Sequence, residues 1–263
     1  MGKIISLVNQ KGGVGKTTTS INLSSSLGYF NKKVLLVDLD PQSNIELSIN
    51  LSSSWTISDF LFGGVAISEC LNSAGTNLDL VRGDSRMQRA EQEDPEKMLD
   101  RMKLIKGYDY IIFDCGPSMN MINKVALLLC KEAIMPTTTD YLGYESITRM
   151  VEFMKEFAEF NEHEIKLSKV VPTFFDVRNK ICSMMLDKIN NDYYQYISSP
   201  VRVNSKLKEA PMKKMSIFKY APNSAGAKDY WALVQGVISD EPLYGFTPAC
   251  DAAVEQAAVE EEE

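Results

Sequence analysis

Lysines, glycines and threonines lie close together in the segment NQKGGVGKTTTSINL, residues 9–23. Backbone N–H groups in a glycine-rich turn can curl round an anion, because no Cβ stands in the way. The Lys16 ammonium can reach the terminal phosphates of a nucleotide, and the Thr17 hydroxyl can ligate Mg²⁺. The segment therefore predicts a phosphate-binding site that includes Gly12, Gly13, Gly15, Lys16 and Thr17.

The segment departs from the usual phosphate-loop pattern, G-x-x-x-x-G-K-[ST]. The pattern requires glycine five positions before Gly15, where this chain has Gln10, and the next residue is a second lysine, Lys11. The spacing leaves two readings open. Either the loop is a damaged nucleotide site, or it belongs to a different kind of site in which Lys11 has its own function.

Two apolar runs elsewhere in the chain end in acidic residues. VLLVDLDPQ supplies Asp38 and Asp40, and YIIFDCGPS supplies Asp114. A magnesium nucleotide site needs carboxylates near the metal and near the attacking water. Any one of these acids alone could merely cap a strand end, but their occurrence together with a phosphate loop indicates a nucleotide-hydrolysing site.

Strand and helix signals alternate along the chain, which favours an α/β fold, and the glycine-rich phosphate loop indicates the P-loop NTPase type. Such a fold is a doubly wound, mostly parallel sheet with helices on both faces, and it binds ligands at the carboxyl ends of its strands. The glycine loop and the acids fall at those ends. We expect strands within residues 3–9, 32–40, 107–118, 132–140 and 165–175, and helices at 17–29, around 147–157 and at 179–196.

Residues 50–105 are less regular and are expected to elaborate the same domain, which we place at residues 1–242. Residues 243–263 form an acidic segment that we expect to be disordered, because the stretch 251–263 carries six acids and no base. The net charge of the whole chain is −7. The segment from Arg202 to Lys219 has the opposite character, with six basic residues and one acid, and such a local patch can bind a polyanion.

Composition narrows the function classes. No run of 18 or more apolar residues suggests a membrane-spanning helix, and the five scattered cysteines favour a reducing cytoplasm without a zinc site. A single histidine gives a Ser-His-Asp mechanism little support. The acidic end would be repelled by anionic lipid, so stable membrane association is not expected.

Four stretches resemble the ParA/Soj branch of the ParA/MinD ATPases, which use a deviant Walker A motif. They are KGGVGKTTTSINL, VLLVDLDPQSN, YDYIIFDCGPS and KLKEAPMKKMSIFKYAPNSAGAKDY, and the similarity covers roughly residues 1–240. The resemblance implies an ATP hydrolase that needs ATP and Mg²⁺. It also offers an answer to the second lysine, because in this family the matching lysine reaches the phosphates of a partner subunit in an ATP sandwich dimer.

The resemblance assigns further roles by position. Asp40 is expected to position or activate the hydrolytic water, and Asp114 to act on Mg²⁺ through water. The implied metal-site residues are Thr17, Asp40 and Asp114, and the implied catalytic residues are Lys11, Lys16 and Asp40. The implied nucleotide contacts are Lys11, Gly12, Gly13, Val14, Gly15, Lys16, Thr17, Thr18 and Asp114, with base contacts from the neighbourhoods of Pro172, Asp176 and Pro200.

The function that the resemblance implies is partitioning of a plasmid, a chromosome or a protein cargo. The ATP-bound homodimer would bind DNA nonspecifically, associate with the nucleoid in the cytoplasm, and be stimulated by a ParB-like partner. The alternatives are a MinD-like membrane-cycling regulator and a positioning ATPase for non-DNA cargo. The candidate DNA contacts, each of which could instead be an ordinary solvated side chain, are Arg202, Lys206, Lys208, Lys213, Lys214, Lys219 and Lys228.

Two positions depart from the family pattern. Gly116 stands where the family has the first of two prolines after the acid that corresponds to Asp114. Ala225 stands where Soj-like relatives have an arginine linked to DNA binding. We expect the first departure to affect the switch loop, and the second to remove one specific DNA contact.

Overall fold

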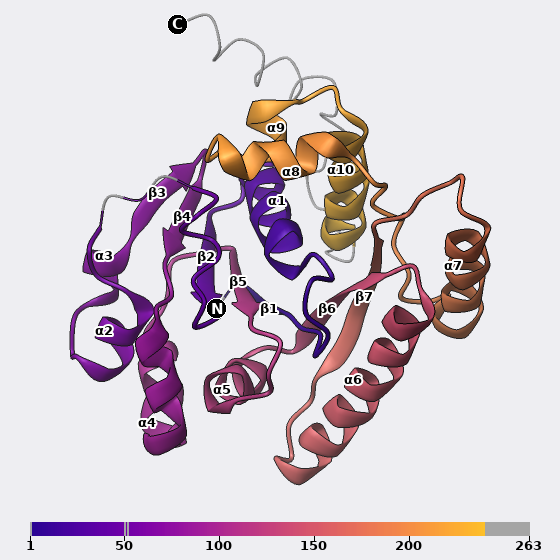
Figure 1. Cartoon of the computed structure of the whole chain (residues 1–263). Coiled ribbons are helices and arrows are strands. Elements are labelled where there is room, and N and C mark those ends of the chain that lie inside the picture. The colour runs from indigo at the N-terminus through magenta and orange to yellow at the C-terminus, as the bar shows by residue number, and fades with distance from the viewer. Residues whose placement is uncertain (1, 50, 52, 240–263) are drawn as a thin grey trace, which may run out of the picture.

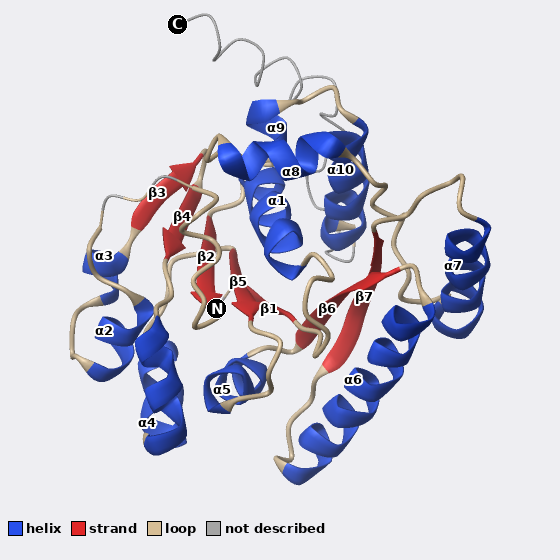
Figure 2. Ribbon diagram, in the orientation of Figure 1, coloured by secondary structure: helices blue, strands red, loops and turns tan. Residues whose placement is uncertain are grey.

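The computed structural model describes residues 2–49, 51 and 53–239, which form a sheet with helices on both faces (Figures 1 and 2). Its spatial strand order is β3-β4-β2-β5-β1-β6-β7, and every neighbouring pair is parallel except β3 with β4. The expected doubly wound α/β fold is thereby confirmed. The strands are β1 (Lys3–Leu7), β2 (Val34–Leu39), β3 (Asn72–Gly75), β4 (Leu78–Val81), β5 (Tyr110–Cys115), β6 (Glu132–Thr138) and β7 (Lys166–Thr173).

Helices connect the strands and continue beyond the last one. Several begin at a side chain that accepts a hydrogen bond from the first turn, as Asn120 does before α5 and Asp140 before α6. The helices are α1 (Lys16–Tyr29), α2 (Ile57–Phe62), α3 (Ile67–Cys70), the 3₁₀ helix η1 (Ser85–Gln92), α4 (Pro95–Met102), α5 (Met121–Leu129), α6 (Tyr141–Phe160), α7 (Lys180–Tyr193), α8 (Ser205–Met212), α9 (Ile217–Tyr220) and α10 (Ala225–Ile238).

Strand β2 shows why the apolar runs of the sequence are continuous. All six of its residues are buried. Leu35 and Val37 belong to the hydrophobic cluster that includes residues of α2, α4, α5 and α6, whereas Val34 and Leu36 belong to the cluster that includes α1, α9 and α10. A strand that is covered on both faces has no solvent side, so its sequence cannot alternate between apolar and polar residues.

Residues 53–105 contribute to the same sheet. Strand β4 pairs in parallel with β2 from Val34↔Leu78 to Val37↔Val81, and β3 adds an antiparallel strand at the edge. These strands of four residues each escaped the sequence analysis, because short runs carry little periodicity. The C-terminal basic segment, which the sequence marked only by its charge, folds into α8 and α9.

No helix among the described residues combines the length and hydropathy that crossing a membrane requires. The expected domain boundary at residue 242 and the acidic segment 243–263 lie outside the described residues.

Helix α1 is held between the sheet and the C-terminal helices. The Trp231 ring of α10 lies 4.5 Å from the ring of Phe218, 5.4 Å from Phe30 and 5.9 Å from Tyr29, as measured between ring centroids. On its other side, α1 approaches the β3–β4 turn so closely that a Cβ built on Gly28 would lie 2.1 Å from the carbonyl oxygen of Thr76. Gly28 is therefore required by a backbone-to-backbone contact.

This contact predicts opposite effects for two glycine-to-alanine substitutions in helices. Gly28→Ala should destabilise the protein by roughly 1–3 kcal/mol, because backbone must shift to admit the methyl group. Gly236→Ala in α10 should be neutral or stabilising by up to about 1 kcal/mol, because the nearest atom to its Cβ position is 3.9 Å away and alanine favours helices. Urea unfolding of both variants measures the difference, and equal midpoints would contradict the close packing of α1 on the turn.

Candidate nucleotide-binding site

The loops that follow β1, β2, β5, β6 and β7 meet at the carboxyl edge of the sheet. Strand β1 lies between β5 and β6, so the glycine loop after it emerges at the centre of this edge. The register places Asp114 of β5 opposite Leu7 on one side and Asp38 of β2 on the other. Parallel topology thus brings the acids and the glycine loop together, as the sequence predicts.

The glycine loop has a backbone conformation that suits anion binding. Gly13 and Gly15 have φ angles of 72° and 86°, in the left-handed region that glycine adopts without strain. A Cβ on Gly12 or Gly13 would meet no atom within 4 Å, so this part of the backbone faces open space. Val14 is buried and its carbonyl accepts a hydrogen bond from Thr173 Oγ1 at 2.9 Å, which anchors the loop to β7. The loop leads directly into α1, whose N-terminus favours an anion.

Lys16 lies over its own loop. Its Nζ donates to the carbonyl oxygens of Asn9 at 2.9 Å and Lys11 at 3.2 Å, and the residue is only 8% exposed. Burial lowers the pKa of Lys16, although the nearby charges of Asp114 and Asp40 favour its protonated form. The partly desolvated ammonium is therefore placed where it would interact with bound phosphates.

Lys11 points in a different direction. Its Nζ forms an ion pair with Asp140 Oδ1 at 2.9 Å, in the loop after β6, and donates to Oγ1 of Thr138, the last residue of β6, at 2.8 Å. Asp140 also caps α6 by accepting from Gly143 N. Burial raises the pKa of Asp140, but hydrogen bonds from Lys11, Thr138 and Gly143 outweigh it, so the pKa lies below its ordinary value. The two lysines of the loop thus occupy separate surroundings.

The three predicted acids are all buried or nearly so. Asp38 accepts from the backbone N–H groups of Asp40 at 3.0 Å and Ile45 at 3.3 Å. Asp40 accepts from Gln42 N at 3.0 Å and from Asn44 Nδ2 at 3.4 Å, so its carboxylate is held by its own loop. Burial, reinforced by the charge of Asp114, raises the pKa of Asp38 well above its ordinary value.

Asp114 is the acid that lacks a partner. It is 1% exposed, and neither of its carboxylate oxygens has a hydrogen-bond partner within range among the described residues. Burial raises its pKa to about 6, although the neighbouring hydroxyls of Thr17 and Ser20 and the charge of Lys16 act against the rise. A buried, unpartnered carboxylate close to the Thr17 hydroxyl is a donor set that fits Mg²⁺, which prefers oxygen ligands and keeps several waters.

A cavity of about 380 Å³ adjoins the glycine loop. Phe174, with a φ of 52° and 44% exposure, stands at its wall after β7. The predicted base contacts Pro172, Asp176 and Pro200 do not line it; Asp176 is instead paired with Arg178 at 2.9 Å. The residues that line the cavity are Gly15, Thr18, Thr173, Phe174, Val201, Arg202, Val203, Asn204, Leu207, Lys208, Pro211 and Tyr230.

Two backbone hydrogen bonds explain why the sequence did not predict the residues that line the cavity after Pro172 and Pro200. Val201 N donates to Pro172 O at 2.7 Å, and Phe175 N donates to Val201 O at 3.1 Å. The segment after Pro200 therefore runs alongside the end of β7, and the residues just beyond Pro172 and Pro200 reach the cavity. The sequence indicated both neighbourhoods, but only this pairing selects the residues.

Comparison with known proteins agrees with this geometry. The model of the family described as "AAA domain" matches residues 2–168. The sporulation initiation inhibitor protein Soj of Bacillus subtilis is 30% identical over 252 residues, which cover 91% of this chain and 100% of that protein. The chromosome-partitioning ATPase Soj of Treponema pallidum is 29% identical over 248 residues, covering 91% and 98%.

The chain belongs to the Soj/ParA family of ATPases. The resemblance noted in its motifs is thereby confirmed. Among solved structures, the septum site-determining protein MinD of Pyrococcus horikoshii, complexed with Mg-ADP, is similar with a TM-score of 0.76. It is 24% identical and the match covers 90% of this chain and 96% of that one, so it supports the fold.

The two departures from the Soj/ParA pattern lie in different parts of the structure. Gly116 follows β5, and a Cβ there would lie 3.4 Å from Asp40 Oδ1, so this glycine borders the acid assigned to hydrolysis. Ala225 is the first residue of α10, immediately after the capping residue Ser224. The first departure therefore adjoins the nucleotide site.

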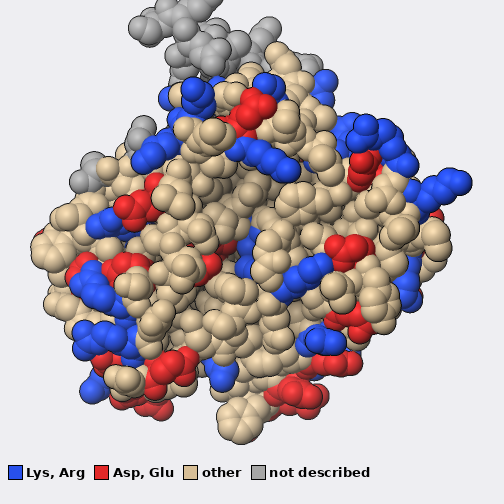
Figure 3. Space-filling view, in the orientation of Figure 1, with Lys and Arg blue, Asp and Glu red and all other residues tan. Residues whose placement is uncertain are grey.

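The candidate DNA-binding residues lie in different surroundings. Arg202 makes an ion pair with Asp229 at 2.6 Å, and Lys206 makes one with Glu209 at 2.7 Å. Lys208 lines the cavity beside the glycine loop, and Lys228 is exposed on α10. Figure 3 shows Lys and Arg side chains gathered over α8 and α9, with acidic side chains among them. The remaining candidates, which line a second cavity, are Lys213, Lys214 and Lys219.

The raised pKa of Asp114 predicts how the nucleotide-free protein responds to pH. Because its pKa is about 6 in the folded chain and 3.8 ordinarily, the folded state holds the proton more tightly. Asp114 therefore costs no stability below pH 4, and the free energy of unfolding falls as the pH rises towards 6. Asp114→Asn should remove that fall, so the variant should gain on the order of 2 kcal/mol relative to wild type between pH 4.5 and pH 7.

Urea unfolding without nucleotide or Mg²⁺ at pH 4.5, 5.5 and 7 measures this gain. Asp187→Asn, at an exposed acid of α7, is the matched control and should show no pH-dependent gain. A gain from Asp114→Asn that is the same at all three pH values would contradict the assignment.

Proposed function

We propose that this protein is a Mg²⁺-dependent partitioning ATPase whose ATP-bound form is a sandwich dimer that binds DNA nonspecifically. In this proposal it positions a plasmid, a chromosome or a protein cargo, and a ParB-like partner stimulates hydrolysis. The observation that carries the proposal is the separation of the two loop lysines. Lys16 lies over its own glycine loop, whereas Lys11 is turned towards Asp140.

Within one subunit, the proposed roles follow from position. The backbone N–H groups of the glycine loop and the Lys16 ammonium would bind the phosphates, and the cavity beside Phe174 would receive the base. Thr17 and Asp114 would hold Mg²⁺, with Asp114 acting through water, and the ion would neutralise charge that develops on the phosphates. Asp40, at 8% exposure on the loop after β2, would orient the attacking water.

Lys11 supplies the proposed link between nucleotide and assembly. In the single chain its charge is already matched by Asp140 and Thr138. A lysine given in trans would exchange these partners for the phosphates of the other subunit, and this exchange is favourable only when nucleotide is present. Dimerisation would then depend on ATP, and any activity confined to the dimer would depend on it too.

The candidate residues for DNA binding differ in whether their charges are available to phosphates. The exposed lysines Lys213, Lys214, Lys219 and Lys228 have no carboxylate within ion-pair distance among the described residues, whereas Arg202 and Lys206 are paired. Dimerisation would double the number of available cations. If the protein instead binds a surface other than DNA, it would still hydrolyse ATP but would have no affinity for DNA.

Lys11→Ala should abolish ATP-dependent DNA binding. We expect wild type to bind a random-sequence duplex with ATP and not with ADP, and its affinity to fall with salt by a log–log slope of about 0.9 per phosphate neutralised. The variant should bind no better with ATP than with ADP, because its dimer lacks the trans lysine. Fluorescence anisotropy over a salt series measures both.

Lys106→Ala, at an exposed lysine before β5, is the control and should bind like wild type. ATP-dependent binding that survives Lys11→Ala would refute the trans role. ATPase activity without DNA binding in any nucleotide state would refute only the proposal that the protein binds DNA.

Asp40→Ala should separate binding from hydrolysis. We expect kcat to fall by about 100-fold, within the range for loss of a general base, while ATP still produces a dimer in analytical ultracentrifugation. The affinity for ATP should stay within a few-fold of wild type. Normal turnover by this variant would mean that another group positions the water.

A further inference from the structure

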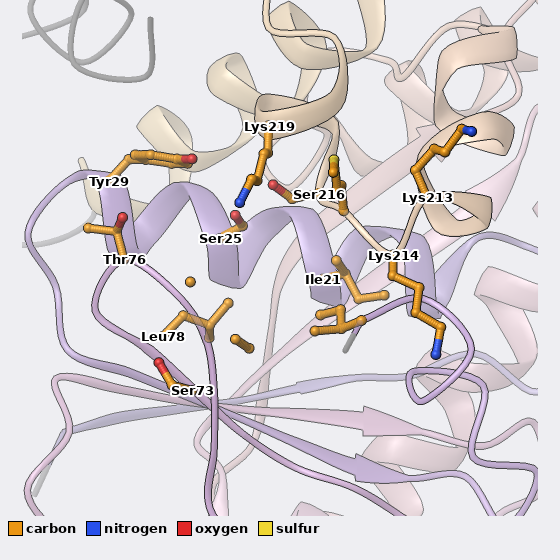
Figure 4. Close-up of a pocket in the computed structure, with 14 residues that line it drawn as sticks. Ile21, Ser25, Tyr29, Ser73, Thr76, Leu78, Lys213, Lys214, Ser216 and Lys219 are labelled. Atoms are coloured by element: carbon orange, nitrogen blue, oxygen red, sulfur yellow. The ribbon is translucent and has the colours of Figure 1, made fainter. Parts of the chain in front are cut away.

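A second cavity, of about 300 Å³, lies between α1, the β3–β4 turn and the segment that joins α8 to α9 (Figure 4). Its apolar lining includes Ile21, Ile49 and Leu78, and Ser25 and Ser73 add hydroxyl groups. It shares no lining residue with the cavity beside the glycine loop. The proposed ATPase site therefore does not account for it.

Three lysines, Lys213, Lys214 and Lys219, form the basic side of this cavity. All three are exposed, and none has a carboxylate within ion-pair distance in the part of the chain that the structure describes. Figure 4 shows Lys219 reaching down towards Ser25, while Lys213 extends away from the cavity. An apolar floor with unpaired cations at and beyond its rim fits a ligand that is polyanionic and carries small apolar groups.

We propose that residues 251–263 of this chain dock over the lysine-rimmed cavity. This segment, DAAVEQAAVEEEE, has six acids and no base, and its other residues are mostly alanine and valine. Its acids complement the three lysines, and its short apolar side chains suit the floor of Ile21, Ile49 and Leu78. The acidic charge and the small apolar side chains of residues 251–263 thus make this segment a suitable occupant of the cavity.

The segment can reach the cavity. Tyr29, which lines the cavity, has its ring centroid 5.9 Å from that of Trp231 in α10. The end of the described chain, Ser239, follows Trp231 by eight residues, or about 12 Å along a helix. The intervening residues 240–250 can span up to roughly 36 Å when extended. Tethering also holds the segment at a high effective concentration, so weak contacts suffice.

Docking has a consequence for polyanion binding. Lys213, Lys214 and Lys219 are also candidate DNA contacts, so a docked acidic segment would compete with the DNA phosphates for them. This consequence rests on the proposed function, but docking itself does not. The contacts are exposed ion pairs, so docking should be reversible and weaken as salt shortens the Debye length from about 10 Å at 0.1 M to about 3 Å at 1 M.

Docking can be tested without DNA by NMR of the ¹⁵N-labelled full chain. The triple variant Lys213→Ala, Lys214→Ala, Lys219→Ala should shift the amide resonances of residues 251–263 towards the positions that wild type shows in 1 M salt. The matched control replaces three exposed lysines elsewhere in the chain, Lys97, Lys106 and Lys155, by alanine and should leave these resonances unchanged. Resonances that are indifferent to the first triple variant, or equally sensitive to both, would overturn the proposal.

The competition is tested by neutralising the segment. Replacing Glu260, Glu261, Glu262 and Glu263 by glutamine should raise the affinity of the ATP-bound protein for a random duplex at least five-fold at 50 mM salt, and the gain should vanish near 1 M. Combined with the first lysine triple variant, the replacement should bring no gain. A gain that persists in the combined variant would indicate general charge repulsion and overturn competition at this surface. Absence of DNA binding in every variant would refute the DNA clause of the proposed function, while the NMR result would still decide docking.

Discussion

The buried charges at the carboxyl edge of the sheet are the constraint on which the site depends. Parallel pairing of β2 with β5 places Asp38 directly opposite Asp114, and both are almost completely buried. Burial disfavours the ionised form of both carboxyls and is the main cause of their raised pKa values, and for Asp38 the charge of Asp114 adds to the rise. The nearby Lys16 ammonium favours the ionised form of Asp114 without forming a direct ion pair with it. The nucleotide-free site therefore stores an electrostatic cost that a divalent cation beside Asp114 would relieve.

The loop above these charges separates two lysines that the sequence places five residues apart. Lys16 opens α1 and is directed back over the loop by the carbonyl oxygens of Asn9 and Lys11. Lys11 precedes the left-handed turn at Gly13, and its side chain leaves towards β6 and Asp140. The same glycine turn that exposes backbone N–H groups also sends the two cations in different directions. The loop that departs from the usual pattern at Gln10 thus holds two lysines, Lys11 and Lys16, for which we propose separate functions.

Helix α1 connects the two cavities of the molecule. Its first turn adjoins the glycine loop and its last turn reaches the lysine-rimmed cavity, where Tyr29 packs against Trp231. Gly28 keeps the helix close to the β3–β4 turn that forms one side of that cavity. The C-terminal helices complete both places, since α8 borders the first cavity and the segment after it borders the second. The basic segment that looked continuous in sequence is therefore divided between two sites.

The sequence by itself determined the glycine loop, the acid-ended strands and the doubly wound fold, because each depends on residues that are neighbours in the chain. Glycine permits the left-handed turn locally. A continuous apolar run that ends near Asp38 or Asp114 indicates both that the strand is buried and roughly where it ends. Tertiary structure decided what distant residues do to one another. It paired Lys11 with Asp140 and Arg202 with Asp229, it aligned the segment after Pro200 with β7 so that Val201 and its neighbours line the cavity, and it added β4 to the sheet. These outcomes depend on strand order and on helix packing, which no local pattern of residues encodes.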